Sequence, residues 1–467
     1  MSILSINPAN EEILQTFEPF SAAQVDQALQ EARQAFKSWR ETSFAERGAL
    51  FHRMARYLRD HKEELGRLAT LEMGKPIVEA EAEAEKCAWN CDFYADNAER
   101  YLADEQVATN ATQSYVEFQP LGVILALMPW NYPYWQVIRF AAPALMAGNT
   151  AVLKHASNVS MCALKVEQIF QECGFPPGVF STVLVPGAET GSLIADRRIA
   201  AVTLTGSDIA GVAVASASGR VLKKNVLELG GSDAFIVLED ADLDGAAQMA
   251  VKARFQNTGQ SCIAAKRFIV VESVAKAFEQ KFVEAASQLK VGDPLQRETQ
   301  IGPMARGDLR DALEQQVADS VKMGARVLLG GKPLPGKGYF YEPTILTQIT
   351  SEMPMFNEET FGPAAAVIYA HDAEHAVALA NDSDFGLGGN LWTGNIERGR
   401  RLARHFESGA VFINSMTASD PRLPFGGIKR SGYGRELSSF GIREFVNVQT
   451  VWIGPAIAPQ PTKVATE

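Results

Sequence analysis

Residues 255–262 read FQNTGQSC, and residues 263–271 continue as IAAKRFIVV. The glycine in the first segment indicates a turn, and the apolar run that ends the second is typical of a buried strand. Cys262 therefore stands on a loop that the following strand can hold rigid. A single cysteine fills a core more often than it acts as a nucleophile, so this pattern alone leaves both interpretations open.

A carboxylate precedes this cysteine in the stretch VLELGG at residues 226–231. It belongs to Glu228, whose apolar neighbours should raise its pKa toward neutrality, as a general base requires. LELGG and NTGQSC, in this order and spacing, resemble the aldehyde dehydrogenase superfamily. The resemblance implies that the Cys262 thiolate attacks an aldehyde and that Glu228 activates the water that releases a free acid.

The composition is that of a globular protein with more than one core. A chain of 467 residues is expected to form about two or three domains. With 46% hydrophobic and 21% charged residues it shows no sign of disorder, and a net charge of −11 argues against a nucleic-acid partner. The five cysteines suggest neither a disulfide framework nor a metal site. No secretion signal or membrane-spanning run is expected, and we predict a cytoplasmic location, which keeps a thiol reduced.

From residue 121 onward, short apolar runs alternate with helical segments, which is typical of a parallel, doubly wound sheet. Before them, residues 21–105 have helical periodicity, with Ser21 as the expected cap of the first helix. The strands are expected to begin at Val123, Thr150, Ser181 and Ala200 in a first series, and at Ala234, Phe268, Arg326, Ala364 and Gly409 in a second. The predicted fold is α/β and aldehyde dehydrogenase-like, with two doubly wound parallel-sheet domains and a strand-based oligomerisation element.

The change of series near Glu228 sets the predicted domain boundaries. They are 1–110 and 122–228 for a Rossmann-like cofactor-binding domain, 229–430 for a catalytic domain, 111–121 and 431–455 for the oligomerisation element, and 456–467 for a flexible tail. The oligomerisation element holds two strand-like segments, and the first ends in Pro120, as suits an edge or intersubunit strand. In relatives, strands so placed pair between subunits, so a homodimer or homotetramer is expected.

Asn131 is the candidate oxyanion donor. It lies in the stretch PWNYP at residues 129–133, directly after a predicted buried strand. There its amide can be held beside the backbone N–H of Cys262, where charge develops on the aldehyde oxygen. The stretch alone is more simply a turn, and the resemblance is what favours the catalytic role.

The stretch TGSDIAG at residues 205–211 follows a predicted strand and opens a helix, which suits a pyrophosphate. Its GxxxxG spacing is weak evidence alone, since a plain turn is as plausible. The resemblance implies that Lys154 holds the adenine ribose, that Glu359 binds the nicotinamide ribose and that Phe361 lies beside the ring. The full set of expected cofactor-binding residues is Trp130, Lys154, Ser157, Gly206, Ser207, Gly211, Leu229, Glu359 and Phe361.

Cofactor choice is predicted from Ser157. NAD-preferring members of the superfamily often carry a glutamate three residues after the ribose-binding lysine, where it repels a 2′-phosphate. Here that position is a short neutral serine that can donate to a phosphate, and His155 can add partial charge. We therefore expect NADP to be preferred, with NAD as the weaker alternative. The competing interpretation is that Ser157 only caps the following helix and that either cofactor is accepted.

Four residues are expected to bind the substrate. Arg139 matches an arginine of succinate-semialdehyde dehydrogenases, the bacterial Sad-type enzymes that this chain most resembles, and can bind a distal carboxylate bidentately. The alternative is a surface arginine paired on its own helix. Ser419 matches a second carboxylate contact, and Phe425 lies in the stretch PFGG near the substrate entrance. Gln256 stands where many members carry another arginine, so weaker carboxylate binding or a broader substrate range is expected.

The predicted reaction is NAD(P)-dependent oxidation of succinate semialdehyde to succinate through a thiohemiacetal and a thioester on Cys262. A broad-range aldehyde dehydrogenase is the alternative. A cysteine hydrolase or thioesterase would need a histidine base, yet only His155 of the six histidines falls in these motifs. A non-catalytic paralogue would have lost Cys262 or Glu228, and both are present. No nucleic-acid, membrane or metal partner is expected.

Overall fold

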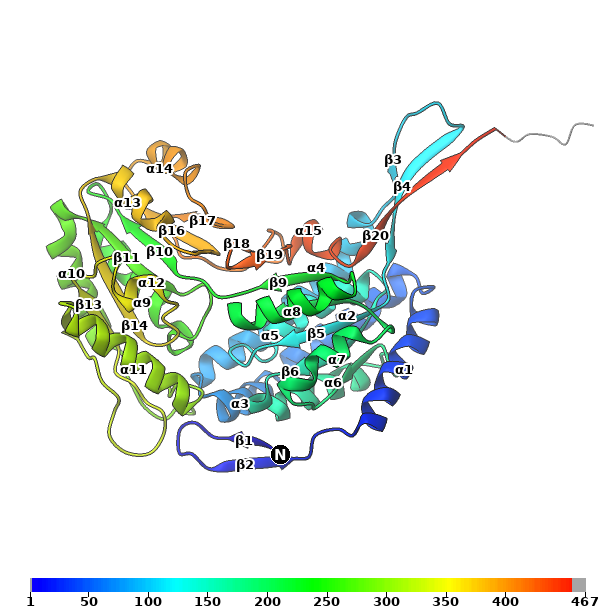
Figure 1. The fold of residues 1–467 in the computed structure, drawn as a ribbon, viewed down its shortest axis with the longest axis horizontal. Coiled ribbons are helices and arrows are strands. Elements are labelled where there is room, and N and C mark those ends of the chain that lie inside the picture. Colours follow the sequence, from blue (N-terminus) through cyan, green and yellow to red (C-terminus); the bar gives the residue numbers. More distant parts are fainter. Residues whose placement is uncertain (1, 456–467) are drawn as a thin grey trace, which may run out of the picture.

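The computed structural model describes residues 2–455 of the chain. It shows two α/β bodies side by side and an arm of three strands that projects from one of them (Figure 1). The predicted fold class, with two largely parallel sheets and a separate strand element, is confirmed. The predicted flexible tail at 456–467 lies outside the described residues.

The first body is built on a six-stranded sheet with the order β19-β9-β8-β5-β6-β7. Its strands are β5 (Val123–Met128), β6 (Thr150–His155), β7 (Phe180–Thr182), β8 (Ile199–Thr205), β9 (Lys224–Glu228) and β19 (Gly432–Tyr433). They are parallel except for β19, which runs antiparallel to β9 and lies within the range expected for the oligomerisation element. All of β5 is buried, because helices cover the faces of a parallel sheet.

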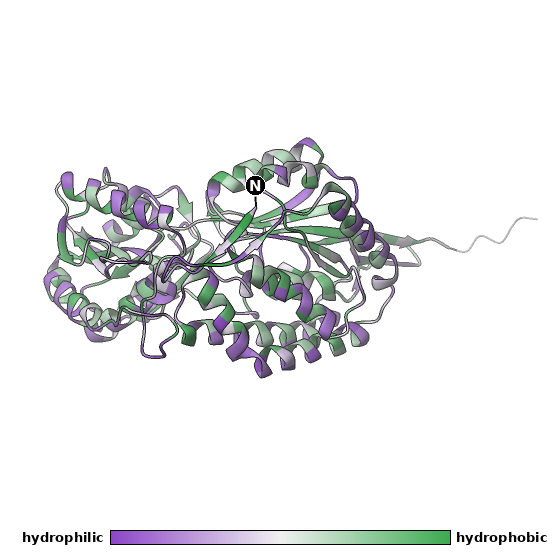
Figure 2. Cartoon of the chain, turned by 90° about the horizontal axis from the view of Figure 1, so that it is seen from below, coloured by the Kyte–Doolittle hydropathy of each residue, from purple (hydrophilic) through white to green (hydrophobic). Residues whose placement is uncertain are grey.

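Helices pack around this sheet, and those on the outside carry hydrophilic residues on their outer faces (Figure 2), whereas every residue of α5 is buried. They are α1 (Ala22–Trp39), α2 (Phe44–Asp60), α3 (Lys62–Met73), α4 (Ile77–Tyr101), α5 (Trp135–Met146), η1 (Ser157–Val159), α6 (Ser160–Glu172), η2 (Gly187–Glu189), α7 (Thr190–Ala195) and α8 (Asp208–Arg220). Ser21 caps α1 as predicted. Its hydroxyl accepts from the backbone N–H of Gln24, whose side chain reaches back to the backbone N–H of Ser21.

The second body is built on a seven-stranded sheet with the order β12-β13-β14-β11-β10-β16-β17. Its strands are β10 (Asp233–Val237), β11 (Ala265–Val271), β12 (Arg326–Leu329), β13 (Thr344–Thr347), β14 (Ala364–Ala370), β16 (Gly388–Trp392) and β17 (Ala410–Ile413). Its helices are α9 (Leu243–Phe255), η3 (Gln256–Gly259), α10 (Glu272–Ser287), α11 (Gly307–Lys322), α12 (Pro354–Asn357), α13 (Ala373–Asn381) and α14 (Ile396–Ala403). Only the edge strand β12 is antiparallel to its neighbour.

The arm is a three-stranded antiparallel sheet of β3 (Glu105–Gln106), β4 (Gln113–Pro120) and β20 (Val446–Ile453). Both strand-like segments of the predicted oligomerisation element therefore pair with each other, over the full length of β20. The expectation that the strand ending at Pro120 is an edge strand is wrong, because β4 lies between β20 and β3. The edge strands of the arm are β20, with eight residues, and β3, with two.

Short elements complete the chain. A hairpin of β1 (Ile3–Ile6) and β2 (Ile13–Phe17), which the sequence analysis did not anticipate, packs on α3 and α6. β15 (Phe385–Gly386) pairs with β18 (Ile428–Lys429), and α15 (Ser438–Ile442) precedes the arm. None of the helices within residues 2–455 combines the length and the apolar character needed to cross a bilayer.

Candidate active site

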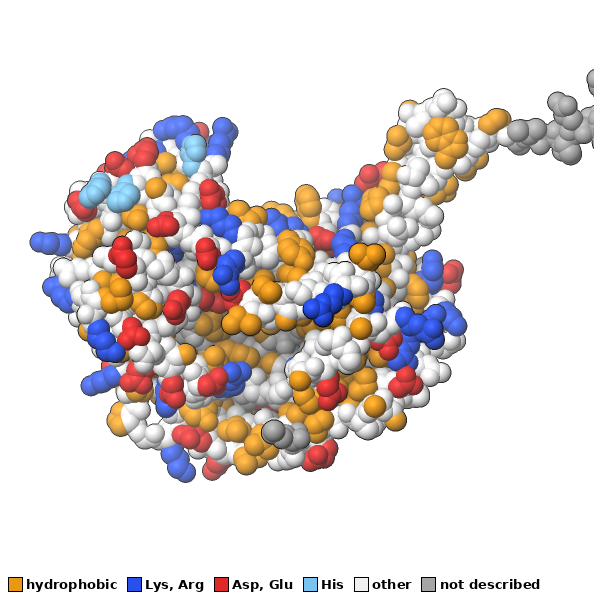
Figure 3. Space-filling view, viewed as in Figure 1, with side chains coloured by type: hydrophobic (Ala, Val, Ile, Leu, Met, Phe, Trp, Pro, Cys, Tyr) orange, Lys and Arg blue, Asp and Glu red, His pale blue; other side chains and the backbone are white. Residues whose placement is uncertain are grey.

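The two bodies enclose a hollow, visible as a recess between them in Figure 3. A cavity of about 530 Å³ is lined by α4, α5, α9 and the loop at 416–425. A second cavity, of about 220 Å³, is lined by the loops that follow β5, β8 and β9. The side chains of Cys262 and Gln136 line both. Two different molecules can therefore approach Cys262 from two sides.

The loop that carries Cys262 has a strained backbone. Asn257 and Thr258, which precede the cysteine on this loop, have φ values of 54° and 55°. Residues other than glycine rarely adopt such positive values. Gly259 follows at φ 72°, and a Cβ there would lie 2.2 Å from the carbonyl oxygen of Gly362. The glycine in the motif is therefore required by close backbone contact, and the turn anticipated before the cysteine is present.

One buried cation holds this loop in place. The guanidinium of Arg254 donates hydrogen bonds to the carbonyl oxygens of Gly259 at 2.6 Å, Gly362 at 2.8 Å and Ala265 at 3.0 Å. Burial lowers the pKa of Arg254 to about 9, so the group stays charged at pH 7 while the carbonyl dipoles compensate it. It ties the cysteine loop to the neighbouring loop that ends at Gly362.

Cys262 is partly exposed and lines both cavities. Burial raises the pKa of Cys262 to about 11, and the charges of Arg139 and Lys266 lower it less than burial raises it. Lys266 donates to the carbonyl oxygens of Cys262 at 2.7 Å and Ser261 at 3.1 Å. The resting group at neutral pH is therefore a thiol, and its proton must leave before it can attack.

Glu228 ends β9 and lines the smaller cavity, with 2% of its surface exposed. Neither carboxylate oxygen has a hydrogen-bond partner among the described residues. Burial raises the pKa of Glu228 well above its usual value, and repulsion from Glu436 raises it further. A Cβ at Gly426 would lie 2.6 Å from Oε1 of Glu228. Gly426, in the PFGG stretch, therefore leaves room for this carboxylate.

Asn131 is buried in the wall of the smaller cavity, directly beside the cysteine loop. Its side-chain Nδ2 donates to the backbone carbonyl oxygen of Gln260 at 3.2 Å, and the backbone carbonyl oxygen of Asn131 accepts from Nδ2 of Asn257 at 2.9 Å. The first contact orients the side-chain amide, and the second holds the backbone of Asn131 against the loop. Because an amide nitrogen has two hydrogens, one remains for an oxyanion at Cys262.

Several of the expected cofactor-binding residues line the smaller cavity, including the two expected at the nicotinamide, Glu359 and Phe361. The rings of Trp130 and Phe361 meet edge to face with centroids 5.7 Å apart, and Leu229 lies in the same wall. The carboxylate of Glu359 accepts from the backbone N–H of Gly231 at 3.0 Å and lies over Gly230, where a Cβ would be 2.3 Å from it. The LELGG motif therefore contains the candidate base, Glu228, and the two glycines that Glu359 packs against.

The predicted phosphate residues lie at the start of α8. Ser207 caps this helix, its hydroxyl accepting from the backbone N–H of Ala210 at 3.3 Å, and Gly206 precedes it at the end of β8. Gly211, one turn later, packs on Leu229, because a Cβ there would lie 2.4 Å from that side chain. Backbone N–H groups at a helix start attract phosphate, so these residues fit a dinucleotide.

Lys154 and Ser157 lie outside both cavities, at the end of β6 and the start of η1. Lys154 is half-buried, which lowers its pKa, while Ser157 is exposed. The interpretation of Ser157 as a helix cap is wrong, because neither η1 nor α6 has a side-chain cap. The expectation that His155 carries a partial positive charge is also wrong. Burial lowers the pKa of His155 to about 4, and its ring bonds to the Pro133 carbonyl at 2.9 Å.

Arg139 lies in the wall of the larger cavity, 2% exposed, with its guanidinium 4.8 Å from the centroid of the Phe425 ring. It forms an ion pair with Glu436 and donates to Oγ1 of Thr205 at 3.3 Å. The alternative of a surface arginine paired on its own helix is therefore wrong. Gln256, the position that lacks the expected arginine, lines the same cavity at the end of α9.

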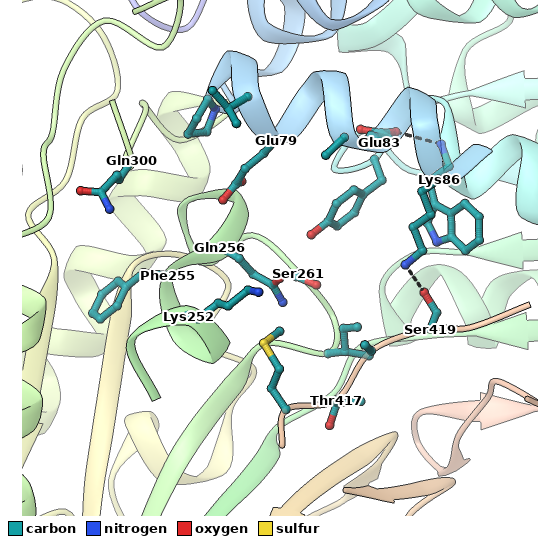
Figure 4. Close-up of a pocket in the computed structure, with 18 of the residues that line it drawn as sticks. Glu79, Glu83, Lys86, Lys252, Phe255, Gln256, Ser261, Gln300, Thr417 and Ser419 are labelled. Carbon is teal, nitrogen blue, oxygen red and sulfur yellow. Dashed lines mark hydrogen bonds between the residues drawn. The ribbon is translucent and has the colours of Figure 1, made fainter. Parts of the chain in front are cut away.

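One face of α4 lines this cavity, and none of the sequence motifs indicated it. Glu79, Glu83 and Lys86 recur along it at intervals of four and three residues, so they share one side of the helix (Figure 4). Lys86 Nζ donates to Oγ of Ser419 at 2.7 Å. The spacing of these charged residues, on a helix otherwise rich in alanine, could have indicated from the sequence that they share one face.

The two glutamates of this face position other parts of the site. Glu83 accepts from the backbone N–H groups of Tyr134 and Trp135, both at 2.8 Å, and so holds the start of α5. Glu79 accepts from the backbone N–H of Asn257 at 2.6 Å, and burial raises its pKa to about 7. Helix α4 therefore contacts both the helix of Arg139 and the strained cysteine loop.

Comparison with known proteins agrees with this geometry. The family model for the aldehyde dehydrogenase family matches residues 1–451. The chain is 54% identical over 453 residues to a Synechocystis sp. protein named probable succinate-semialdehyde dehydrogenase (NADP+), covering 97% of this chain and 100% of that one. It is 50% identical over 449 residues to the Escherichia coli succinate semialdehyde dehydrogenase (NAD(P)+) Sad, covering 96% and 97% of the two chains.

A solved structure is also similar over nearly the whole chain. The Streptococcus pyogenes succinic semialdehyde dehydrogenase, determined in complex with NADP+, superimposes with a TM-score of 0.95 at 37% identity. The match covers 97% of this chain and 100% of that one.

Cys262→Ala should abolish turnover of aldehydes, because only the nucleophile is removed. The variant should still bind a nicotinamide cofactor with nearly the wild-type Kd and melt at nearly the wild-type temperature. Formation of the reduced nicotinamide, followed by its absorbance, gives the activity, and fluorescence titration gives the Kd. Retention of more than a few per cent of the wild-type rate would show that another group attacks the aldehyde.

Proposed function

This chain belongs to the aldehyde dehydrogenase family, and we propose that it oxidises succinate semialdehyde to succinate with NADP as the preferred cofactor. The observation that carries the proposal is the position of Cys262, shared by two cavities, with the candidate base Glu228 in one and a cationic wall in the other. The names of the relatives from Synechocystis and Escherichia coli support the substrate.

In the proposed reaction, the Cys262 thiol first gives its proton to solvent water in the cavity. The sulfur then bonds to the aldehyde carbon while the carbonyl electron pair moves to oxygen. The amide of Asn131 donates to that oxygen and stabilises its charge. When bound, the nicotinamide cofactor accepts the hydride that leaves the carbon. The product on Cys262 is a thioester, which is prone to hydrolysis.

Deacylation then depends on Glu228. Its carboxylate takes a proton from water as the water oxygen bonds to the thioester carbon, and the sulfur leaves with the electron pair of the broken C–S bond. A buried carboxylate with a raised pKa is a stronger base than one in water, so burial serves this step. Release of succinate leaves Cys262 free for the next aldehyde.

We further propose that the two bodies divide these tasks. Most of the expected cofactor residues come from the six-stranded body, at the carboxyl ends of β5, β6, β8 and β9. Cys262 comes from the loop before β11 in the seven-stranded body. Ligands of open α/β sheets bind at the carboxyl ends of strands, which supports this division. We also propose a cytoplasmic location, because the free Cys262 thiol requires a reducing compartment.

The wild-type enzyme should oxidise succinate semialdehyde with a higher kcat/KM than butanal, which has the same chain length without the carboxylate. The preference arises because the wall of the larger cavity carries Lys86 and Arg139. Absorbance of the reduced nicotinamide measures both reactions. Equal values for the two aldehydes would overturn succinate semialdehyde as the substrate and favour a broad-range enzyme.

We propose that the arm joins subunits into a homodimer or homotetramer. Its free strand β20 exposes Val448, Trp452 and Ile453, with 62%, 53% and 42% of their surfaces accessible. An exposed apolar edge strand invites pairing with another strand, and a second copy of this chain provides one. Light scattering at micromolar concentration should therefore give at least twice the 50.7 kDa of one chain. A mass of one chain would contradict this assembly.

Ser157→Glu should weaken NADP binding while sparing or improving NAD binding. The new carboxylate would repel a dianionic 2′-phosphate by about 1–3 kcal/mol, a factor of roughly ten to a hundred in kcat/KM. The neutral variant Ser157→Ala is the matched control and should change the NADP/NAD ratio less. If the wild-type kcat/KM is already higher with NAD, the charge argument at this position fails.

A further inference from the structure

Lys86 is a cation in the wall of the larger cavity, on the side that α4 contributes (Figure 4). Its Nζ donates to Oγ of Ser419 at 2.7 Å and lies 4.5 Å from the centroid of the Trp135 ring. Figure 4 shows its side chain reaching from the helix toward the loop of Ser419. The ammonium group is thus held between an aromatic ring and a hydroxyl, next to open space.

The other charged groups around Lys86 are already paired. On its own helix, Glu83 forms a buried ion pair with Lys75. On the loop of Ser419, Asp420 binds Arg422 with Nη2 and Oδ2 2.6 Å apart. Among the ion pairs of residues 2–455, none includes Lys86. The cavity wall therefore contains a positive charge without a paired carboxylate.

Arg139, the sequence-based candidate for the carboxylate, is in the opposite situation. Its guanidinium already forms an ion pair with Glu436, and the Phe425 ring covers one of its faces. A substrate carboxylate at Arg139 would therefore approach Glu436 as well. Arg139 adds positive potential to the cavity, but its charge is shared with a residue of the protein.

From these contacts we propose that Lys86 binds the distal carboxylate of the substrate, with Ser419 as its partner, and thereby sets the specificity for aldehydes that carry an ω-carboxylate. This inference rests on the proposed oxidation of succinate semialdehyde. Nζ has three donors and Oγ can donate its own hydrogen, so one carboxylate can accept from both groups. Lys86 would then supply the second cation that Gln256 does not.

A structural role is the competing explanation, in which Lys86 only supports Trp135 and the loop of Ser419. Burial, together with the nearby charge of Arg139, lowers the pKa of Lys86 to about 8. A partly buried ammonium with no counter-ion is costly for folding alone, whereas it gains from a bound anion. The two roles differ in what they predict for substrates with and without a carboxylate.

The test compares kcat/KM for succinate semialdehyde and for butanal in variants of the full-length enzyme. Lys86→Met keeps the length of the side chain and removes its charge. The ratio of the two kcat/KM values should fall roughly tenfold or more, mainly through KM for the semialdehyde, because charged hydrogen bonds contribute more than neutral ones. Lys86→Arg should restore part of the ratio, since it restores the charge.

Lys252→Met is the matched control. Lys252 also lines the larger cavity but is exposed, and its charge acts on the neighbouring carboxylate of Glu79. Its removal takes away the same charge without touching the proposed binding pair, so the ratio should change much less. Similar losses in Lys252→Met and Lys86→Met would mean that only the general potential of the cavity matters, and would overturn the specific role of Lys86.

The pH dependence gives an independent readout. The charged and titratable groups that face Lys86 are Glu83 and Cys87 on α4, Arg139 on α5 and Asp420 on the loop. In the wild type, the ratio should decline as the pH rises above about 8, where Lys86 loses its proton, because the carboxylate then loses its cation. In Lys86→Met this decline should disappear. Dividing by the butanal rate removes the titration of Cys262 and Glu228, which both substrates share.

The outcomes separate this inference from the proposed function. If the wild type does not prefer the semialdehyde over butanal, the proposed substrate is wrong. If the wild type has the preference and a folded Lys86→Met keeps it, the substrate stands and the role of Lys86 is wrong. If Lys86→Met does not fold, Lys86→Gln and the wild-type pH profile of the ratio decide, and a flat profile would overturn the inference.

Discussion

The active site depends on one buried cation that joins two loops. Arg254 donates to carbonyl oxygens on both the cysteine loop and the loop that ends at Gly362. Those carbonyls would otherwise be buried without partners, which is costly. With them bound, Asn257 and Thr258 can keep left-handed backbone conformations that the loop alone would not hold. The thiol is therefore positioned by interactions of its neighbours, since its own side chain forms few.

The same loop links the substrate side to the cofactor side. The side chain of Asn131 donates to the carbonyl oxygen of Gln260, and the carboxylate of Glu79 accepts from the backbone N–H of Asn257. The six-stranded body therefore holds a loop of the seven-stranded body by two hydrogen bonds. Because both contacts are directional, a small shift between the bodies would misplace Cys262 relative to the oxyanion donor. These two hydrogen bonds therefore help to place the nucleophile where the two cavities meet.

The charges around Glu228 set its pKa and so its strength as a base. Burial and the nearby Glu436 both raise the pKa of Glu228, whereas Arg139 opposes them. Arg139 in turn pairs with Glu436, so the arginine limits the repulsion between the two glutamates. Arg139 therefore affects the pKa of the candidate base, Glu228, as well as the charge of the substrate cavity. That dual position is a physical reason for a second cation, Lys86, to meet the substrate.

The class of fold and the motifs could be predicted from the sequence, because strands that alternate with helices and short motifs such as NTGQSC and LELGG are local patterns. Cys262, Glu228, Asn131 and Glu359 were proposed as site residues from the resemblance that these motifs carry. Which charges remain unpaired follows from the tertiary structure alone. Lys86 meets Ser419, 333 positions away, and Arg139 meets Glu436 through packing of separate elements. The same packing makes His155 neutral and places β4 between two strands. Burial and pairing arise from contacts between distant segments, and no local pattern of residues encodes them.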